Sequence, residues 1–242
     1  MVGRGRNLAG LGLLAAASAL GVPAVNDPKA IELVRNKVAM QAVLAHHQMP
    51  LPRTWFAGDP SVFAELPADL FPLVVKPFDG DGAAGLALLT APADVALLPP
   101  TGGRTTLYLA QEYLETDGFD VKLYGIGPRV WAVRKPSPVR FDGPGPAVVT
   151  AATGADLIDL DAGLTDIALT CGRACGLELW GVDVAMTPAG PAVIEVNDFP
   201  TYSAVPDAGA AIAAHVLTLV RLHAIARSTG RDHYLTLVRR PQ

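Results

Sequence analysis

The chain has 242 residues, which is enough for one large domain or two small ones. Half of the residues are hydrophobic and 17% are charged, so the chain can bury a sizeable core. The formal net charge of −4 creates no field that attracts nucleic acid. We therefore expect no nucleic-acid partner, and any anionic ligand needs local positive charge. The two cysteines, Cys171 and Cys175, indicate buried thiols rather than a zinc site.

The N-terminal segment has two interpretations. Arg4 and Arg6 precede an apolar run over residues 8–20, a pattern that resembles a secretory signal. The alternative, which we favour, is a helix of small residues followed by a strand over residues 22–25. The run is too short to span a membrane, so we expect no membrane partner.

The next part of the chain predicts helices and strands in alternation. Asp27 and Pro28 suit the start of a helix, which we expect to continue to about His47. Asp59 can cap a second, shorter helix that ends near Leu66. Predicted strands cover residues 53–57, 71–77, 86–89 and 107–114.

A glycine-rich loop follows the strand that ends near Lys76. Residues 80–85 read Gly-Asp-Gly-Ala-Ala-Gly, which has the spacing of a dinucleotide-binding fingerprint. That fingerprint needs a helix after the glycines, whereas the following segment is short and ends at Pro92. We therefore predict a flap whose backbone N–H groups can cover phosphates, with a plain glycine-rich turn as the alternative.

The second half of the chain predicts an antiparallel meander and a hairpin. Strands are expected over residues 119–124 and 129–135, and helices over residues 164–176 and 207–227. Arg134 and Lys135 end the second strand, where cations can meet an anionic ligand or simply face water.

Three oxygen-bearing side chains converge in the predicted hairpin. Glu195 lies in an apolar strand, where an unpaired carboxylate is costly, and Asn197 points to the same face because side chains alternate along a strand. Asp183 lies in the preceding strand, across a turn at residues 187–191. Carboxylate and amide oxygens suit Mg²⁺, so the pattern predicts a metal site, with a satisfied pair of buried acids as the alternative.

Taken in order, these motifs resemble those of the ATP-grasp enzymes. The motifs are Lys37 before Pro52-Arg53-Thr54, Val74-Val75-Lys76-Pro77 with the glycine loop, Gln111-Glu112-Tyr113, Gly118-Phe119-Asp120-Val121-Lys122, Gly181-Val182-Asp183 and Glu195-Val196-Asn197. Each is weak alone, but the ordered set is specific and covers roughly residues 22–227. The resemblance implies an α+β ATP-grasp fold, in which two α+β subdomains grip ATP, preceded by a truncated α/β segment. It also implies a cytoplasmic protein.

The resemblance implies that the chain is divided into four parts. Residues 1–50 would be the remnant of a preceding domain with a linking helix, and residues 51–115 the small subdomain with the glycine loop. Residues 116–228 would form the C-terminal subdomain with the metal site, and residues 229–242 a tail. An ATP-grasp enzyme usually has a complete preceding domain of about 80–120 residues. If this preceding domain is truncated in the present chain, an apolar edge would be exposed, and such an edge favours a homo-oligomer.

The resemblance also implies roles for single residues, with ATP as co-substrate. Lys37 and Lys76 would hold phosphates, and the loop from Gly82 to Gly85 would cover them. The adenine would be bound by Gln111, Glu112 and Tyr113, the ribose by Asp120, and Mg²⁺ or Mn²⁺ by Asp183, Glu195 and Asn197. Arg134 would be the catalytic arginine that steadies the transferred phosphate.

The motifs leave three functional interpretations open: two enzyme subgroups of the ATP-grasp family and one class without activity. Glu195 as the first residue of its motif resembles glutathione synthetases and RimK-type ligases, which join a carboxylate to an amine through an acyl phosphate. Residues 133–138 and 197–202 resemble inositol 1,3,4-trisphosphate 5/6-kinases instead. The third possibility is an ATP-binding module without activity. We favour a ligase whose partner is a small molecule or peptide with a carboxylate, because basic residues for a polyphosphate substrate are few.

Overall fold

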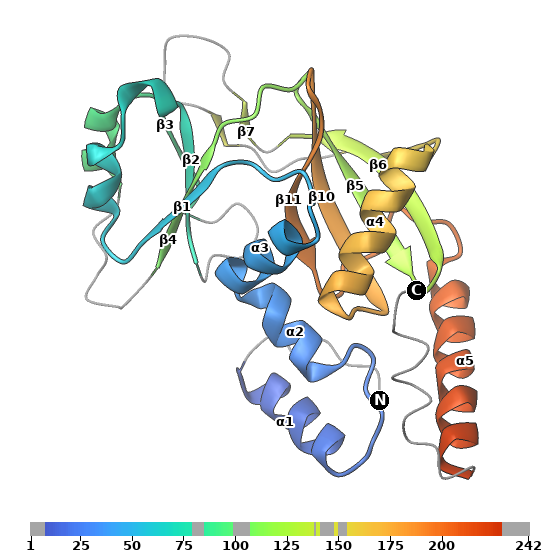
Figure 1. Cartoon of the computed structure of the whole chain (residues 1–242). Helices are drawn as coiled ribbons and strands as arrows, with labels where there is room; N and C mark the ends of the chain where they lie inside the picture. Colours follow the sequence, from blue (N-terminus) through green and yellow to red (C-terminus); the bar gives the residue numbers. More distant parts are fainter. Residues whose placement is uncertain are drawn as a thin grey trace.

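The computed structural model describes residues 8–78, 85–98, 107–137, 139–140, 148–149 and 154–228. Two antiparallel sheets dominate these residues, a smaller one built from the first half of the chain and a larger one built from the second (Figure 1). Three helices form the N-terminal region: α1 (Leu8–Ala19), which lies against α2 (Pro28–Arg35), and α3 (Lys37–His46), which lies near the edge of the larger sheet. The mixed helices and antiparallel sheets confirm the predicted α+β class.

The smaller sheet has its own core. Its strands have the order β1-β4-β2-β3. They are β1 (Thr54–Ala57), β2 (Leu73–Pro77), β3 (Ala87–Leu89) and β4 (Tyr108–Glu112). Three 3₁₀ helices accompany them: η1 (Pro60–Glu65), η2 (Ala68–Leu70) and η3 (Pro92–Leu97). Phe63 of η1 and Val95 of η3 pack against Leu73, Val75 and Leu89. These two 3₁₀ helices therefore cover one face of the smaller sheet.

The larger sheet has the strand order β11-β10-β5-β6-β9. Its strands are β5 (Phe119–Ile126), β6 (Arg129–Pro136), β9 (Asp156–Ile158), β10 (Leu179–Thr187) and β11 (Gly190–Asn197). Every strand pair in it is antiparallel, as the predicted meander and hairpin require. A separate two-stranded ribbon joins β7 (Val139–Arg140) and β8 (Val148–Val149).

The helix α4 (Ala162–Cys175) covers one face of the larger sheet. It ends at Gly176, which adopts the left-handed conformation that lets a helix stop in this way. Cys171 and Cys175 are buried against the sheet as free thiols, as predicted. Trp180 fills the space left by two glycines and donates from its Nε1 to the Ala168 carbonyl at 3.1 Å.

The long helix α5 (Ala208–Ser228) stands at the far end of the larger sheet (Figure 1). His215 fixes it, because its Nε2 lies 2.9 Å from Glu178 Oε2 and its ring sits over Gly127. Within the described part of the chain, α5 is the one helix long and apolar enough to cross a membrane by length and composition alone. A single helix of this kind is weak evidence for a membrane span.

Two expectations for the N-terminal region were wrong. The helix predicted from Pro28 to about His47 is two helices, because Asn36 leaves the helical conformation and caps α3 by accepting from the Ala39 N–H at 3.0 Å. The strand predicted over residues 22–25 does not form, and Val25 makes only an isolated bridge. The α1 helix instead packs through Leu11 and Leu14 on Ile31 of α2.

Candidate functional site

The predicted hairpin is present as β10 and β11. Asp183 pairs directly with Glu195, and Asn197 pairs with Gly181, so the three candidate ligands share one face of the sheet. On the other side of β10, Lys122 of β5 pairs with Asp183. This face is opposite to the one that α4 covers.

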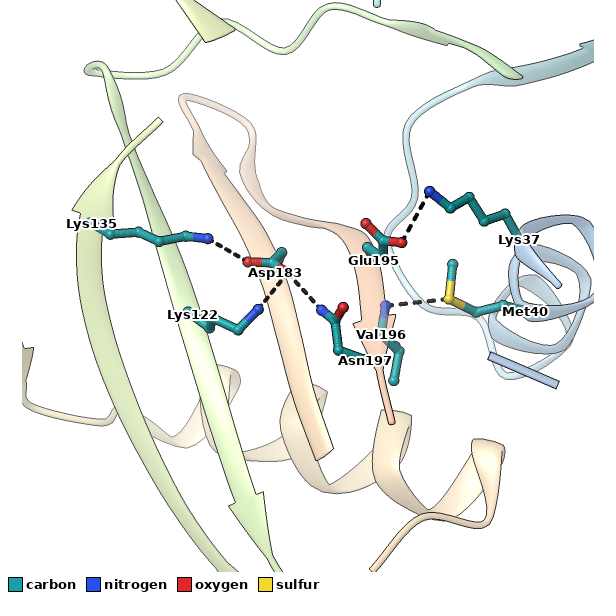
Figure 2. Close-up of polar contacts among 8 residues, drawn as sticks. All are labelled: Lys37, Met40, Lys122, Lys135, Asp183, Glu195, Val196 and Asn197. Atoms are coloured by element: carbon teal, nitrogen blue, oxygen red, sulfur yellow. Dashed lines mark hydrogen bonds and ion pairs between the residues drawn. The ribbon is translucent and has the colours of Figure 1, made fainter. Parts of the chain in front are cut away.

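Asp183 is the centre of a polar cluster (Figure 2). Its Oδ2 accepts from Lys122 Nζ at 2.8 Å and from Asn197 Nδ2 at 2.8 Å, and its Oδ1 accepts from Lys135 Nζ at 2.7 Å. Burial raises the pKa of a carboxyl group, but the two ammonium groups outweigh it and lower the pKa of Asp183 from 3.8 to about 2. The same carboxylate raises the pKa of Lys135, against the effect of burial. Asp183 is therefore an anion held between two cations.

Glu195 forms an ion pair with Lys37 and interacts through its charge with Lys76. Lys37, which is 7% exposed, places its Nζ 3.4 Å from Glu195 Oε1, and α3 carries it there from the N-terminal side of the sheet (Figure 2). Lys76 comes from β2 of the smaller sheet. Burial lowers the pKa of Lys76, Glu195 acts against this shift, and the charge of Lys37 adds to it. The structure thus brings both predicted phosphate-binding lysines to the edge of the predicted metal site.

The donor set suits a hard divalent ion. Two carboxylates and one amide oxygen are ligands that Mg²⁺ accepts, and Mg²⁺ usually keeps waters and substrate phosphates for its other positions. In the part of the chain that the structure describes, no three His, Cys, Asp or Glu side chains gather as a metal cluster. Both Asp183 oxygens already accept hydrogen bonds, so a bound ion would take the position of a lysine ammonium group.

A cavity opens between the two sheets, next to this cluster. Both sheets contribute to it, and most of its lining is apolar. The lining residues are Pro52, Val74, Lys76, Leu86, Gln111, Glu112, Tyr113, Leu114, Thr116, Asp120, Ser137, Val139, Ala185 and Ile194. Five of the predicted ATP-binding residues therefore meet in one cavity, and apolar residues that the sequence motifs did not single out, such as Leu86, Ala185 and Ile194, complete it.

The predicted adenine-binding segment lies along this cavity with its polar side chains already engaged. Gln111 Nε2 donates to Thr54 Oγ1 at 3.1 Å. Glu112 accepts from the backbone N–H of Arg53 at 2.9 Å and from its guanidinium at 2.6 Å. These contacts hold the segment against β1, and the backbone N–H groups of Glu112 and Tyr113 likewise donate to the carbonyls of Arg53 and Pro72.

Asp120, the predicted ribose-binding residue, is 5% exposed on β5. Burial raises the pKa of its carboxyl group from 3.8 to about 6, although Lys135 and the Ser137 hydroxyl favour the ionised form. It points to the same face as Asp183, since it pairs with Lys135 of β6 and with Ala185 of β10.

Arg134 is not brought to this site. It pairs with Val121, which places it on the α4 side of the sheet. There its Nη2 lies 2.8 Å from Asp117 Oδ2, and its guanidinium stacks 3.5 Å from the centre of the Phe119 ring. Lys135, the next residue, points into the site instead. Strand alternation could have found Lys122 and Lys135, because both share a face with Asp120 once the pairing of the strands is known.

The predicted phosphate-covering loop is described only at its end. Gly82 lies outside the described residues. Gly85 has φ +74°, and a Cβ there would lie 3.0 Å from the Pro77 side chain. Glycine is therefore required at the point where the chain returns to β3.

Comparison with known proteins agrees with this geometry. D-cycloserine synthetase DcsG aligns with a TM-score of 0.70 and 19% identity, over 87% of this chain and 78% of that one. The ATP-grasp ligase PsnB, complexed with a minimal precursor, aligns with a TM-score of 0.64 and 22% identity, over 86% and 68%. The fold is therefore the ATP-grasp fold.

Sequence comparison is more specific. The RimK-like ATP-grasp domain matches residues 34–220, so the chain belongs to the RimK-like ATP-grasp family. A probable alpha-L-glutamate ligase of Shewanella loihica is 30% identical over 185 residues, which are 75% of this chain and 61% of that protein. A probable alpha-L-glutamate ligase 1 of Pseudoalteromonas atlantica is 32% identical over 187 residues, with the same two shares. The chain thus spans about three fifths of the length of these relatives.

Proposed function

We propose that this protein is an ATP- and Mg²⁺-dependent ligase that joins a carboxylate to an amine. The observation that carries the proposal is the meeting of Asp183, Glu195 and Asn197 with four lysines beside an apolar cavity. A purine ring suits the cavity, and a polyphosphate suits its lysine-rich end. The kinship with proteins named as glutamate ligases favours a ligase over a kinase.

The charges of the site account for its preference for metal-bound nucleotide. Lys37, Lys76, Lys122 and Lys135 face Asp183, Glu195 and Asp120, which leaves an excess of one positive charge when all are ionised. That is too little for a triphosphate alone. Asp183, Glu195 and Asn197 would hold Mg²⁺, which supplies positive charge to the phosphate oxygens when bound.

In this mechanism the chain positions groups and stabilises charge. The substrate carboxylate attacks the γ-phosphorus of ATP, ADP leaves, and an acyl phosphate forms. The amine then attacks the acyl carbon, inorganic phosphate leaves with the bonding electrons, and the amine proton passes to solvent, so an amide remains. Lys135 and Lys122, which flank Asp183, would hold the oxygens of the transferred phosphate, the role that the resemblance gave to Arg134.

The substrate is proposed as a small molecule or peptide with a free carboxylate. The test is to incubate the protein with ATP, Mg²⁺, pooled amino acids or carboxylate-bearing peptides, and hydroxylamine as the amine. A ligase should release phosphate and form a hydroxamate only when a carboxylate is present, and Asp183→Ala should abolish both products. In a parallel incubation with labelled ATP and pooled inositol phosphates, transfer of labelled phosphate to the polyol, without hydroxamate in the first assay, would show a kinase instead.

A further inference from the structure

One stretch of the chain, residues 26–40, holds the outer edge of β11 at three of four successive positions. Lys37 contacts Glu195, and the Val196 N–H donates to Met40 Sδ at 3.3 Å (Figure 2). Asp198, just beyond the strand, receives the other contacts of this stretch. The side chain of Asn197, between them, donates to Asp183 instead.

Asn26 supplies the first contact to Asp198. Its side chain is 1% exposed and fully hydrogen-bonded. Its Nδ2 donates to the Leu179 carbonyl at 2.7 Å and also to the Asp198 carbonyl. Its Oδ1 accepts from the N–H groups of Glu178 at 2.8 Å and Leu179 at 2.9 Å. The carboxamide of Asn26 therefore bonds β10 on one side and the end of β11 on the other.

This position matters because the strand ladder ends there. The last backbone pair between β10 and β11 joins Gly181 to Asn197. Beyond this pair, Asn26 links Leu179 to Asp198 through its side chain. A candidate metal ligand thus lies in the final pair of a ladder that a side chain from elsewhere closes.

Arg35 supplies the second contact. Its Nη2 lies 3.1 Å from Asp198 Oδ2. Asn26 and Arg35 flank α2 at its two ends, and Asp27 caps that helix by accepting from the Lys29 N–H at 2.9 Å. The helix therefore fixes the separation of the two groups that grip Asp198.

We propose that Asn26 and Arg35, here called the β11 brace, are positioning residues that fix Asn197 relative to Asp183 and thereby set the affinity of the site for its divalent ion. The proposal rests on the proposed function, because it assumes that these residues bind metal. Removal of a group that orients a metal ligand typically weakens metal binding by about 10- to 100-fold.

The test measures Mn²⁺ binding to the ADP complex by electron paramagnetic resonance, and ADP binding in the presence of EDTA. Asn26→Ala should weaken Mn²⁺ binding by about 10-fold or more and leave metal-free ADP binding unchanged. The matched control is Asp161→Ala. It removes the α4 cap, whose Oδ1 accepts from the Leu164 N–H at 2.7 Å, and α4 covers the opposite face of the sheet. It should destabilise the fold without changing either affinity.

Arg35→Gln keeps the proposal testable if Asn26→Ala does not fold. The Arg35 side chain is 31% exposed, so the substitution should be tolerated. Loss of a cation near the site would by charge alone tighten Mn²⁺ binding, whereas loss of the brace should weaken it several-fold. Tighter or unchanged binding in Arg35→Gln would overturn the proposal. If the wild-type protein with ADP binds no Mn²⁺, the assignment of the metal site is wrong, and the proposed role of the β11 brace is wrong with it.

Discussion

At the scale of single residues, the site is a balance between carboxylates and lysines. Asp183 sits between Lys122 and Lys135, and Glu195 sits beside Lys37. Ions about 4 Å apart interact by roughly 4 kcal/mol at an effective dielectric near 20, so each pair matters to affinity. The site is in this way already arranged for charged ligands.

The neighbours Lys135 and Arg134 offer a direct test of which cation serves the phosphate. Lys135→Ala should lower turnover by about 100-fold or more, because it removes a cation from the site, while Asp183 keeps Lys122 as a partner. Arg134→Ala should leave turnover close to that of wild type, because its partners are Asp117 and Phe119 on the other face. Steady-state phosphate release measures both. Equal losses in the two variants would contradict the assignment.

Asp120 should make stability depend on pH. Its pKa is about 6 in the folded protein against 3.8 for the free side chain, so the folded state binds a proton that the unfolded state does not. Stability should therefore fall as pH rises from about 4 to about 6, by on the order of 3 kcal/mol, and stay low above that. Asp120→Asn should remove this slope and be the more stable protein at pH 7. Urea denaturation across this range measures it, and an unchanged slope would argue against a buried acid.

The sequence predicted the carboxylates better than the cations. Glu195 and Asn197 are two apart in one strand, so their common face follows from the period of a strand alone. Choosing between Arg134 and Lys135 requires knowing that β6 pairs with β5 in one register, since a shift of one residue exchanges the two faces. That register depends on tertiary packing, which motif order does not contain.

At the scale of elements, the break between α2 and α3 changes how the site is built. Apolar spacing continues through Asn36, so periodicity predicts one helix. Asn36 instead ends α2 and caps α3, because its short side chain can bond the backbone N–H of Ala39. The break gives Arg35 and Lys37 separate helices. Arg35 can then reach Asp198 while Lys37 reaches Glu195.

The docking of α5 depends on a glycine. Gly127 has φ +56°, and a Cβ there would lie 2.4 Å from His215 Cε1. Both variants carry the strain of a positive φ, but only Gly127→Ala adds a clash with His215, so it should destabilise the protein by at least about 1 kcal/mol more than Gly21→Ala, which has φ +79° and open space around it. Urea denaturation of both variants measures the difference. In a His215→Ala background the excess should disappear, and its persistence would show that α5 is not the cause.

At the scale of the whole molecule, the site exists only where the two sheets meet. Lys76 and Gln111 come from the smaller sheet, while Asp120 and Ile194 come from the larger one, and all four line one cavity. The family resemblance predicted this meeting, because ATP-grasp proteins grip ATP between two subdomains. Helix and strand patterns alone could not, since no local signal fixes how two sheets face each other.

Lys76 should show opposite effects on stability and on binding. Burial lowers its pKa, so the charged side chain costs stability in the absence of ligand. Lys76→Met should therefore melt at the same or a higher temperature than wild type without nucleotide, yet bind ADP at least about 10-fold more weakly. Thermal unfolding with and without ADP and Mg²⁺ measures both. Lys29→Met, at an exposed position of α2, should change neither.

The pairing of Asp183 with two lysines has a thermodynamic consequence. A divalent ion that binds Asp183 releases an ammonium group, and a polyphosphate that attracts the same ammonium group exposes the carboxylate. Each ligand thus prepares the site of the other, and the factor by which metal tightens nucleotide must equal the factor by which nucleotide tightens metal. In Lys135→Ala that shared factor should shrink. In the wild-type protein, the two lysines would thus neutralise Asp183 until nucleotide and metal bind, and would pair with the phosphates afterwards.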